Sequence, residues 1–196
     1  MEYTPKSQWE YIYQTIPQHQ IPWETGEASP DLATLIHEKI LKKGTKVLDA
    51  GCGLGTQTCF MARNGAVATG IDISETAVKK AREQMLKENY TAHFVVGDVC
   101  KMPMPNASFE FVYDRGCYHH LSPIERMDYV KEVHRVLVPG GIFHLLVFAG
   151  ALTTQEVIEL FLPDFQPLKA YEDIIIDHTN NDQQLTIHIV EFKKTG

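Results

Sequence analysis

The sequence predicts an α/β fold with a doubly wound, mostly parallel sheet of about seven strands and helices on both faces. Three observations predict it. Short apolar runs alternate with amphipathic helical patterns along most of the chain. A glycine-rich turn at residues 51–55 follows the first apolar run. Near the C-terminus, two strand patterns flank Asn180-Asn181-Asp182, which predicts an antiparallel hairpin at one edge of the sheet.

The elements follow one another in a regular order. The predicted strands are 46–50, 68–72, 93–96, 109–114, 142–148, 172–177 and 184–192. The predicted helices are 7–16, 31–42, 56–63 and 75–89, one that begins after Ser122-Pro123, and one that contains Val157, Ile158 and Phe161. Ser29-Pro30, Ser74 and Ser122-Pro123 are typical helix starts.

Size and charge define the class of protein. The chain has 196 residues, a net charge of −7 and a pI near 5.7, with 44% apolar and 22% charged residues. These values predict one globular domain with its own core. The acidic balance argues against a nucleic-acid partner, which needs clustered lysine and arginine. We expect a single domain over 1–196, with an N-terminal helix and lid segment at 1–30 and a core at 31–196.

Membrane, targeting and metal signals are not found in the sequence. No apolar run approaches the roughly 20 residues that span a bilayer, and the first residues lack the apolar segment of a signal peptide. The four cysteines show no Cys-x-x-Cys spacing. We therefore expect a cytoplasmic protein with no membrane partner and no metal site, as a monomer or weak homodimer.

The glycine-rich turn is the strongest single signal in the chain. Asp49 ends a strand, and Gly51, Gly53 and Gly55 follow it before a helix. Glycine lets the backbone approach a ligand closely, and the helix start presents unpaired N–H groups. The dinucleotide fingerprint needs its third glycine where this chain has Thr56. With that departure, the stretch resembles motif I of class I S-adenosylmethionine-dependent methyltransferases.

Acidic residues also follow the next two strands. Asp72 lies 21 positions after Gly51, where nucleotide-binding βαβ units carry the acid that binds ribose hydroxyls. Gly70-Ile71-Asp72 resembles motif II of the same family, and Gly97-Asp98-Val99 resembles motif III. The resemblance implies a seven-stranded Rossmann-like fold, S-adenosyl-L-methionine as cofactor and S-adenosyl-L-homocysteine as product. It places the cofactor-binding residues at Trp23, Asp49, Gly51, Cys52, Gly53, Gly55, Thr56, Asp72, Ile73, Gly97, Asp98, Val99, Asp114 and Arg115.

A narrower resemblance lies before the core. Residues 21–30, which contain Pro22-Trp23-Glu24-Thr25-Gly26, resemble a segment of the thiopurine, thiol, halide and tellurite methyltransferase group. In that group the N-terminal helix and tryptophan cover cofactor and acceptor. Tellurite enzymes carry basic residues after strand five, whereas residues 149–156 contain no lysine or arginine. The resemblance therefore implies a small-molecule acceptor, a thiol or other soft nucleophile rather than an oxyanion.

A cluster after the fourth strand supplies candidate catalytic groups. Asp114, His119 and His120 are the candidates for a general base, which an alcohol or amine acceptor needs and a soft nucleophile does not. The two histidines have an alternative role, which is packing at the start of the following helix. Cys117 lies in the same cluster and is expected to be a small packed residue rather than a nucleophile. The alternative functions are an O- or N-methyltransferase that uses a His/Asp base, an NAD-binding oxidoreductase, and a non-catalytic cofactor-binding subunit.

Overall fold

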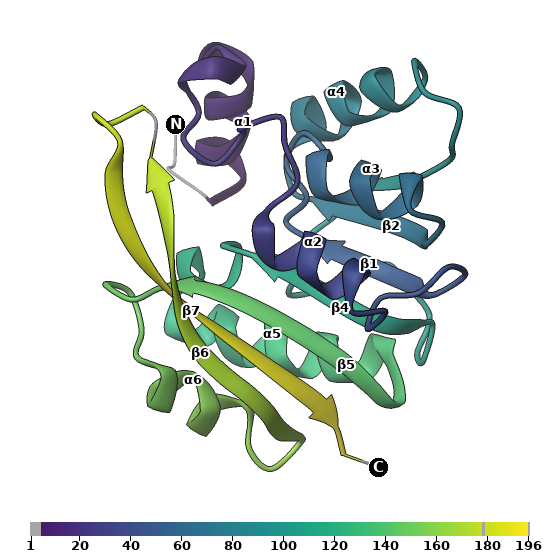
Figure 1. Cartoon of the computed structure of the whole chain (residues 1–196), viewed down its shortest axis with the longest axis vertical. Helices are drawn as coiled ribbons and strands as arrows, with labels where there is room; N and C mark the ends of the chain where they lie inside the picture. The colour runs from purple at the N-terminus through teal and green to yellow at the C-terminus, as the bar shows by residue number, and fades with distance from the viewer. Residues whose placement is uncertain (1–4, 178, 196) are drawn as a thin grey trace. The chain divides into compact units, whose positions relative to one another are not determined.

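The computed structural model describes residues 5–177 and 179–195. The chain forms two compact units, 1–98 and 99–196. The strand order is β3-β2-β1-β4-β5-β7-β6, parallel except for the C-terminal strands and flanked by helices (Figure 1). This arrangement confirms the predicted α/β fold class.

The first unit is built on three parallel strands. β1 (Lys46–Ala50), β2 (Val67–Asp72) and β3 (His93–Val96) lie in the order β3-β2-β1. In register, Asp49 on β1 pairs with Gly70 on β2, and Asp72 on β2 pairs with Val96 on β3. Since the strands are parallel, their carboxyl ends meet at one edge, and the residues that follow β1 and β2 become neighbours.

Helices complete the first unit. They are α1 (Pro5–Thr15), η1 (Gln18–Gln20), α2 (Pro30–His37), α3 (Thr56–Arg63) and α4 (Glu75–Met85). α4 begins where predicted, because the Oγ of Ser74 accepts a hydrogen bond from the N–H of Ala77 at 3.0 Å.

Two predicted helix ends are wrong. The predicted helix 75–89 ends at Met85, and the predicted helix 31–42 ends at His37. In the second case Lys39 adopts a φ of 60°, and the N–H of Leu41 donates to the carbonyl of Leu35 at 3.0 Å. The chain turns there because this bond brings Leu41 into the core, where it is buried.

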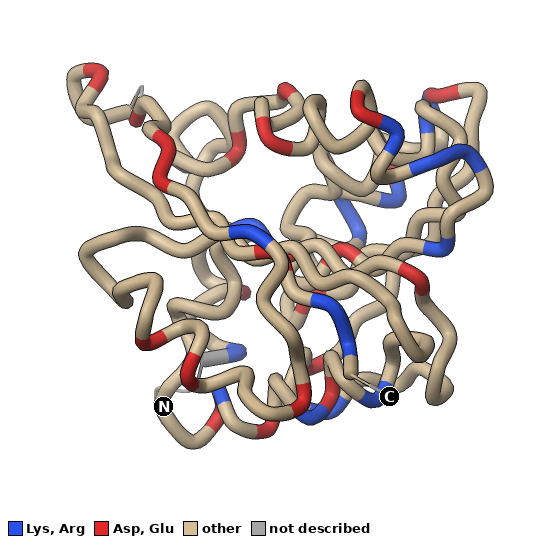
Figure 2. Tube along the Cα trace, turned by 60° about the horizontal axis from the view of Figure 1, so that its bottom comes forward, with Lys and Arg blue, Asp and Glu red and all other residues tan. Residues whose placement is uncertain are grey.

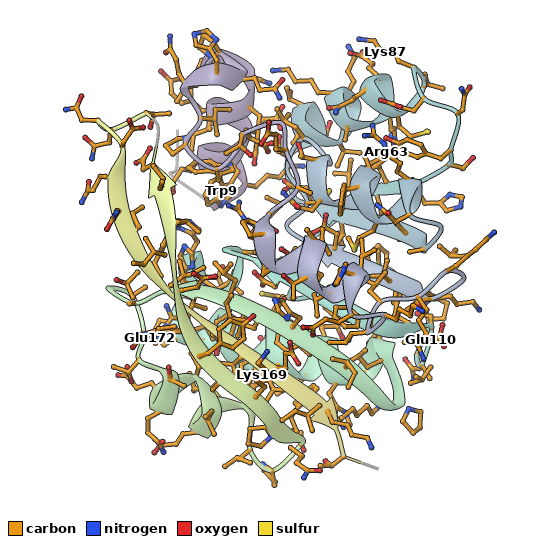
Figure 3. All side chains as sticks on the ribbon, viewed as in Figure 1. Trp9, Arg63, Lys87, Glu110, Lys169 and Glu172 are labelled. Atoms are coloured by element: carbon orange, nitrogen blue, oxygen red, sulfur yellow. The ribbon has the colours of Figure 1, made fainter. Side chains whose placement is uncertain are left out.

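The N-terminal segment packs on the glycine-rich turn within this unit. Tyr13 of α1 and Ile21 are buried together with Leu54 of the turn. Trp9, labelled in Figure 3, and Trp23 lie against this cluster with ring centroids 5.7 Å apart. The apolar face predicted for the first helix is therefore used to cover the turn.

The second unit joins a parallel pair to an antiparallel hairpin. Its elements are β4 (Phe109–Arg115), η2 (Tyr118–His120), α5 (Pro123–Val136), β5 (Leu137–Phe148), α6 (Thr154–Phe161), β6 (Phe165–Asp177) and β7 (Gln183–Lys194). β4 is parallel to β5, β5 is antiparallel to β7, and β7 is antiparallel to β6. The hairpin strands are longer than the sequence predicted.

The predicted strand 142–148 begins earlier in the structure, since Pro139-Gly140-Gly141 lies inside β5. The pairing register shifts there, since Phe109 pairs with Leu137 but Phe111 pairs with Ile142. The chain therefore bulges out of the ladder and returns to it, rather than leaving the strand.

Charged residues are distributed along both units without a basic run, as the coloured trace in Figure 2 shows. Among the residues that the structure describes, none of the helices combines the length and the apolar character needed to cross a bilayer.

Four phenylalanines form the core beneath the hairpin. Phe143, Phe161, Phe165 and Phe192 have no exposed surface, and the rings of Phe161 and Phe192 stack with centroids 4.7 Å apart. These side chains come from β5, α6, β6 and β7, so they tie the helix to the sheet.

Replacing Phe161 by alanine should therefore leave a cavity that the sheet cannot fill. We expect the free energy of unfolding to fall by about 3–5 kcal/mol, measured by urea denaturation. Leu160→Ala is the matched control on the same helix, because the side chain of Leu160 is 42% exposed. An equal loss in both variants would contradict this assignment of the core.

Candidate functional site

The glycine-rich turn lies against the N-terminal segment. Gly53 has a φ of 53°, and a Cβ at this position would lie 2.7 Å from the phenolic oxygen of Tyr13 and would collide with the carboxylate of Glu24. Gly55 has a φ of 80°, and its Cβ would lie 2.7 Å from the ring of Phe94. Larger residues are therefore excluded at both positions, and neighbouring side chains pack directly against the backbone of the turn.

Asp72 joins this turn to the next βα unit. One carboxylate oxygen accepts a hydrogen bond from the N–H of Gly53 at 2.9 Å, and the other accepts from the N–H of Ser74 at 2.9 Å. Burial raises the pKa of Asp72, while these N–H groups act in the opposite direction. Ser74 caps α4 itself, as predicted, but Asp72 already accepts hydrogen bonds from the backbone, and the N–H of Ile73 is a further backbone donor to its carboxylate.

Glu24 is a site residue that the sequence analysis did not select. Its Oε1 accepts a hydrogen bond from the N–H of Leu54 at 2.9 Å, and its Oε2 lies 3.5 Å from the hydroxyl of Thr56. This carboxylate therefore occupies the start of α3, where unpaired N–H groups and the helix dipole favour negative charge. Its place beside Trp23 in the Pro-Trp-Glu-Thr-Gly segment is the signal that identifies it.

Glu10 and Tyr13 were missed in the same way. Glu10 accepts hydrogen bonds from the hydroxyl of Ser74 at 2.7 Å and from the N–H of Thr76 at 3.2 Å. The hydroxyl of Tyr13 accepts a hydrogen bond from the indole N–H of Trp23 at 3.1 Å. Burial, followed by the charges of Asp72 and Glu24, raises the pKa of Tyr13. Both residues lie on α1, and only the tertiary structure brings them to the turn.

Asp49 and Cys52 are buried residues that pack within the glycine-rich turn and the strand before it. Asp49 is buried and accepts a hydrogen bond from the hydroxyl of Thr58 at 2.5 Å, which ties β1 to α3. Burial, followed by the charge of Asp72, raises the pKa of the Cys52 thiol. A protonated, buried thiol is a packing group rather than a nucleophile.

The structure brings the other predicted residues of the first unit to the same strand ends. The N–H of Gly51 donates to the carbonyl of Ile71 at 2.9 Å, and that of Gly97 donates to the carbonyl of Asp72 at 2.9 Å. Ile73 is half-buried and Asp98 is exposed. Val99 is a buried residue at the start of the second unit.

Asp114 anchors the turn after β4 in the second unit. Its carboxylate has no exposed surface and accepts hydrogen bonds from the N–H of Cys117 at 2.8 Å, the N–H of Tyr118 at 3.1 Å and the hydroxyl of Tyr129 at 2.7 Å. Burial, followed by the charge of Asp114, raises the pKa of Tyr129. The carboxylate therefore holds η2 in place. The neighbouring Arg115 is half-buried.

His119 and Tyr118 are polar groups without internal partners. Both ring nitrogens of His119 and the hydroxyl of Tyr118 are buried and have no hydrogen-bond partner among the described residues. The ring of His119 lies against Phe148, with centroids 4.7 Å apart, and against His120 at 4.3 Å. Burial, followed by the charges of His120 and Arg126, lowers the pKa of His119 to about 3. This imidazole is therefore neutral near pH 7 and can accept a hydrogen bond or a proton.

The remaining candidates differ from His119. His120 is exposed, and Cys117 is half-buried. Within the described part of the chain, no three His, Cys, Asp or Glu side chains are grouped closely enough to hold a metal ion.

Comparison with known proteins links part of the chain to a methyltransferase domain. Residues 47–141 match the family model of a methyltransferase domain. An uncharacterized methyltransferase of Synechocystis sp. is 33% identical over 128 residues, which cover 65% of this chain and 52% of that protein. The chain spans about half the length of this curated relative, and less of several others.

Solved structures share the fold. One, which concerns the conversion of a disulfide bond into a thioacetal group during echinomycin biosynthesis, matches with a TM-score of 0.87 at 21% identity, over 97% of this chain and 93% of that one. Another is 1,6-didemethyltoxoflavin-N1-methyltransferase of Burkholderia thailandensis, with its substrate and S-adenosylhomocysteine bound. It matches with a TM-score of 0.76 at 22% identity, over 97% of this chain and 87% of that one.

These matches support a class I S-adenosylmethionine-dependent methyltransferase. The S-adenosylhomocysteine bound in the Burkholderia structure agrees with the predicted cofactor, S-adenosyl-L-methionine. The matches do not confirm the narrower resemblance to the thiopurine and tellurite group, which stays a prediction.

The neutral state of His119 has a measurable effect on stability. The folded protein holds its pKa near 3, below the ordinary value of 6.5, so the unfolded chain takes up a proton that the folded chain refuses. The contribution of the neutral ring to stability is present above pH 6.5 and is lost as the pH falls below it. Between about pH 7 and pH 5, the wild type should lose about 2 kcal/mol more unfolding free energy than His119→Gln.

Urea denaturation at a series of pH values tests this expectation. His93→Gln is the matched control, because His93 is exposed at the start of β3. Parallel pH dependence of the wild type and His119→Gln would contradict a buried, neutral His119.

Proposed function

We propose that the protein transfers a methyl group from S-adenosyl-L-methionine to a small-molecule acceptor and acts as a single methyltransferase domain over 1–196 in the cytoplasm. The observation that carries the proposal is the turn at Gly51–Gly55, held by Asp72 at the carboxyl ends of parallel strands. Open α/β sheets bind nucleotide ligands at this edge.

The residues present fit this cofactor. Gly53 carries no side chain, so Tyr13 and Glu24 of the N-terminal segment reach the backbone of the turn directly. The carboxylate of Asp72 is proposed to accept a hydrogen bond from a ribose hydroxyl of the cofactor. Asp98 is exposed at the end of the next strand and is proposed to accept from the adenine amino group. Trp23 and Tyr13, joined by a hydrogen bond, are proposed to cover this side of the site.

The bound cofactor supplies an electrophilic methyl group and a neutral leaving group. The contribution of the protein is therefore position and exclusion of water, because an in-line displacement needs the acceptor aligned with the methyl carbon. The glycine-rich turn and Asp72 hold the donor. The cluster of Trp9, Trp23 and Tyr13 excludes water from this side of the turn.

Among the three residues predicted to be catalytic, the geometry favours His119. It has a neutral, buried ring with both nitrogens unpartnered among the described residues, whereas Asp114 is committed to three donors. We therefore assign His119 to the acceptor, as the group that accepts its hydrogen bond or proton, and Asp114 to positioning. His120 is assigned to the flank of this ring, 4.3 Å from it.

Two acceptor classes fit this arrangement. A thiol or other soft nucleophile needs only orientation, and it follows from the resemblance of residues 21–30 to the thiol and thiopurine group. A hydroxyl or amine acceptor must lose a proton, and the buried ring nitrogens of His119, which have no partner among the described residues, are proposed to accept a hydrogen bond from it. The lowered pKa of His119 makes the ring a weak base, so its proposed role is to orient such an acceptor. An NAD-dependent oxidoreductase is a weaker alternative, because Thr56 replaces the third glycine of the dinucleotide fingerprint.

Asp72→Asn tests the cofactor site. The amide presents one acceptor oxygen instead of two and carries no charge, so both the backbone contacts and the contact with ribose weaken. We expect the binding free energy of S-adenosylhomocysteine to fall by about 1–3 kcal/mol, measured by isothermal titration calorimetry. The control is Glu75→Gln on the first turn of α4, whose side chain is exposed. Unchanged affinity of Asp72→Asn would remove Asp72 from the site.

Turnover against an acceptor panel tests the function itself. S-adenosylhomocysteine release is measured with thiols, thiopurines, halides, phenols and amines for the wild type and for His119→Gln. With a phenol or amine, we expect His119→Gln to lower kcat by about a hundredfold; with a thiol, the change should be much smaller. Absence of cofactor binding together with absence of turnover would overturn the proposed function.

A further inference from the structure

The outer edge of β6 is a free strand edge. β6 lies at the end of the strand order, so none of the described strands pairs with this edge. The strand is 13 residues long, and Leu168 and Ile174 on it are 50% and 55% exposed. Exposed N–H and C=O groups along such an edge are able to bind another strand. The edge is therefore an interaction surface that the proposed activity does not use.

One hydrogen bond shows which backbone groups point outward. The N–H of Ile174 donates to the side-chain carboxylate of Asp173 at 2.8 Å. We interpret this contact as the N–H of Ile174 pointing to the free edge, away from β7. Because backbone direction alternates along a strand, Ala170 and Glu172 also present their N–H and C=O groups outward.

The charged side chains on this strand are placed symmetrically. The ammonium of Lys169 lies 4.4 Å from the ring centre of Tyr171, so both side chains are on one face of the hairpin. Alternation along the strand places Asp173 on the same face. Lys169 and Asp173 thus flank Tyr171 with opposite charges. Within the hairpin, Lys169 lies opposite Glu191 of β7, and Figure 3 labels Lys169 and Glu172 on this strand.

We propose that β6 pairs antiparallel with β6 of a second copy of this chain, centred on Tyr171. In this register Lys169 of each copy lies opposite Asp173 of the other. A two-fold axis relates the two copies, so this pair occurs twice and the same surface of both copies forms the interface.

The alternation of the backbone and the charges select this register. Outward-facing residues must pair with outward-facing residues, so Ala170 lies opposite Glu172 of the second copy, and the register moves only in steps of two residues along the strand. Shifting the centre to Glu172 places Lys169 opposite Ile175. Shifting it to Ala170 places Lys169 opposite Tyr171. The ion pairs form only when Tyr171 is at the centre.

Pairing also changes the role of Asp173. In the single chain its carboxylate covers the outward N–H of Ile174. In the dimer this N–H donates to a carbonyl of the partner strand, and the carboxylate turns to Lys169 of the second copy. The side chain thus protects the edge in the monomer and contributes to the interface in the dimer.

Charge exchange tests the proposal by sedimentation velocity over a wide range of protein concentration. Lys169→Asp places carboxylates opposite each other, and Asp173→Lys places ammonium groups opposite each other. Each single variant should raise the dimer dissociation constant at least about tenfold. The double variant Lys169→Asp/Asp173→Lys restores opposite charges and should bring the constant back within about threefold of the wild type.

Mixing the two single variants gives a further test, because each introduced Asp then meets an introduced Lys, and the mixture should form heterodimers. Lys193→Asp on β7 of the same hairpin is the matched control and should leave the constant unchanged. Circular dichroism checks that every variant is folded. A wild type that stays monomeric at all concentrations overturns the interface, and a double variant that fails to recover overturns the register.

Discussion

The hydrogen bonds to the carboxylate of Asp72 are the constraint on which the first unit depends. They join the glycine-rich turn after β1 to the start of α4 after β2, at 2.9 Å each. A buried carboxylate without such donors is unstable, so this geometry requires the N–H of Gly53 to point at Asp72. That requirement gives Gly53 its left-handed conformation and removes its side chain. The space so opened is where Tyr13 and Glu24 approach.

The second unit uses the same device for a different purpose. Asp114 is fully buried and accepts two backbone N–H groups and the hydroxyl of Tyr129. Its negative charge is satisfied locally, and the turn that carries His119 is fixed in the process. Asp114, which is charged, therefore has a structural role, whereas the neutral His119 carries the polar atoms that have no partner among the described residues. Residue type alone does not separate these roles, because an aspartate and a histidine can each act as a general base.

Local patterns predicted the parts of the structure that depend on neighbours in sequence. The starts of β1, β3 and β4, the caps at Ser74 and Ser122, and the glycine-rich turn are all set within a few residues. Glu10 and Glu24 were not predicted, because they reach Ser74 and Leu54 from far along the chain. The end of α2 was missed for a similar reason, since burial of Leu41 overrides a helical pattern that continues to residue 42.

The long hairpin shows how an exposed edge can be both protected and selective. A single lysine would discourage pairing with any strand, whatever its sequence. Lys169 and Asp173, two residues either side of Tyr171, discourage most registers but satisfy each other in one antiparallel arrangement. The N–H of Ile174 is covered by Asp173 until that arrangement forms. Breaking the hydrogen bond between the N–H of Ile174 and the carboxylate of Asp173 costs free energy. A partner strand offsets this cost only if it places a carbonyl opposite the N–H and a lysine opposite the carboxylate. The edge is therefore selective for such a strand.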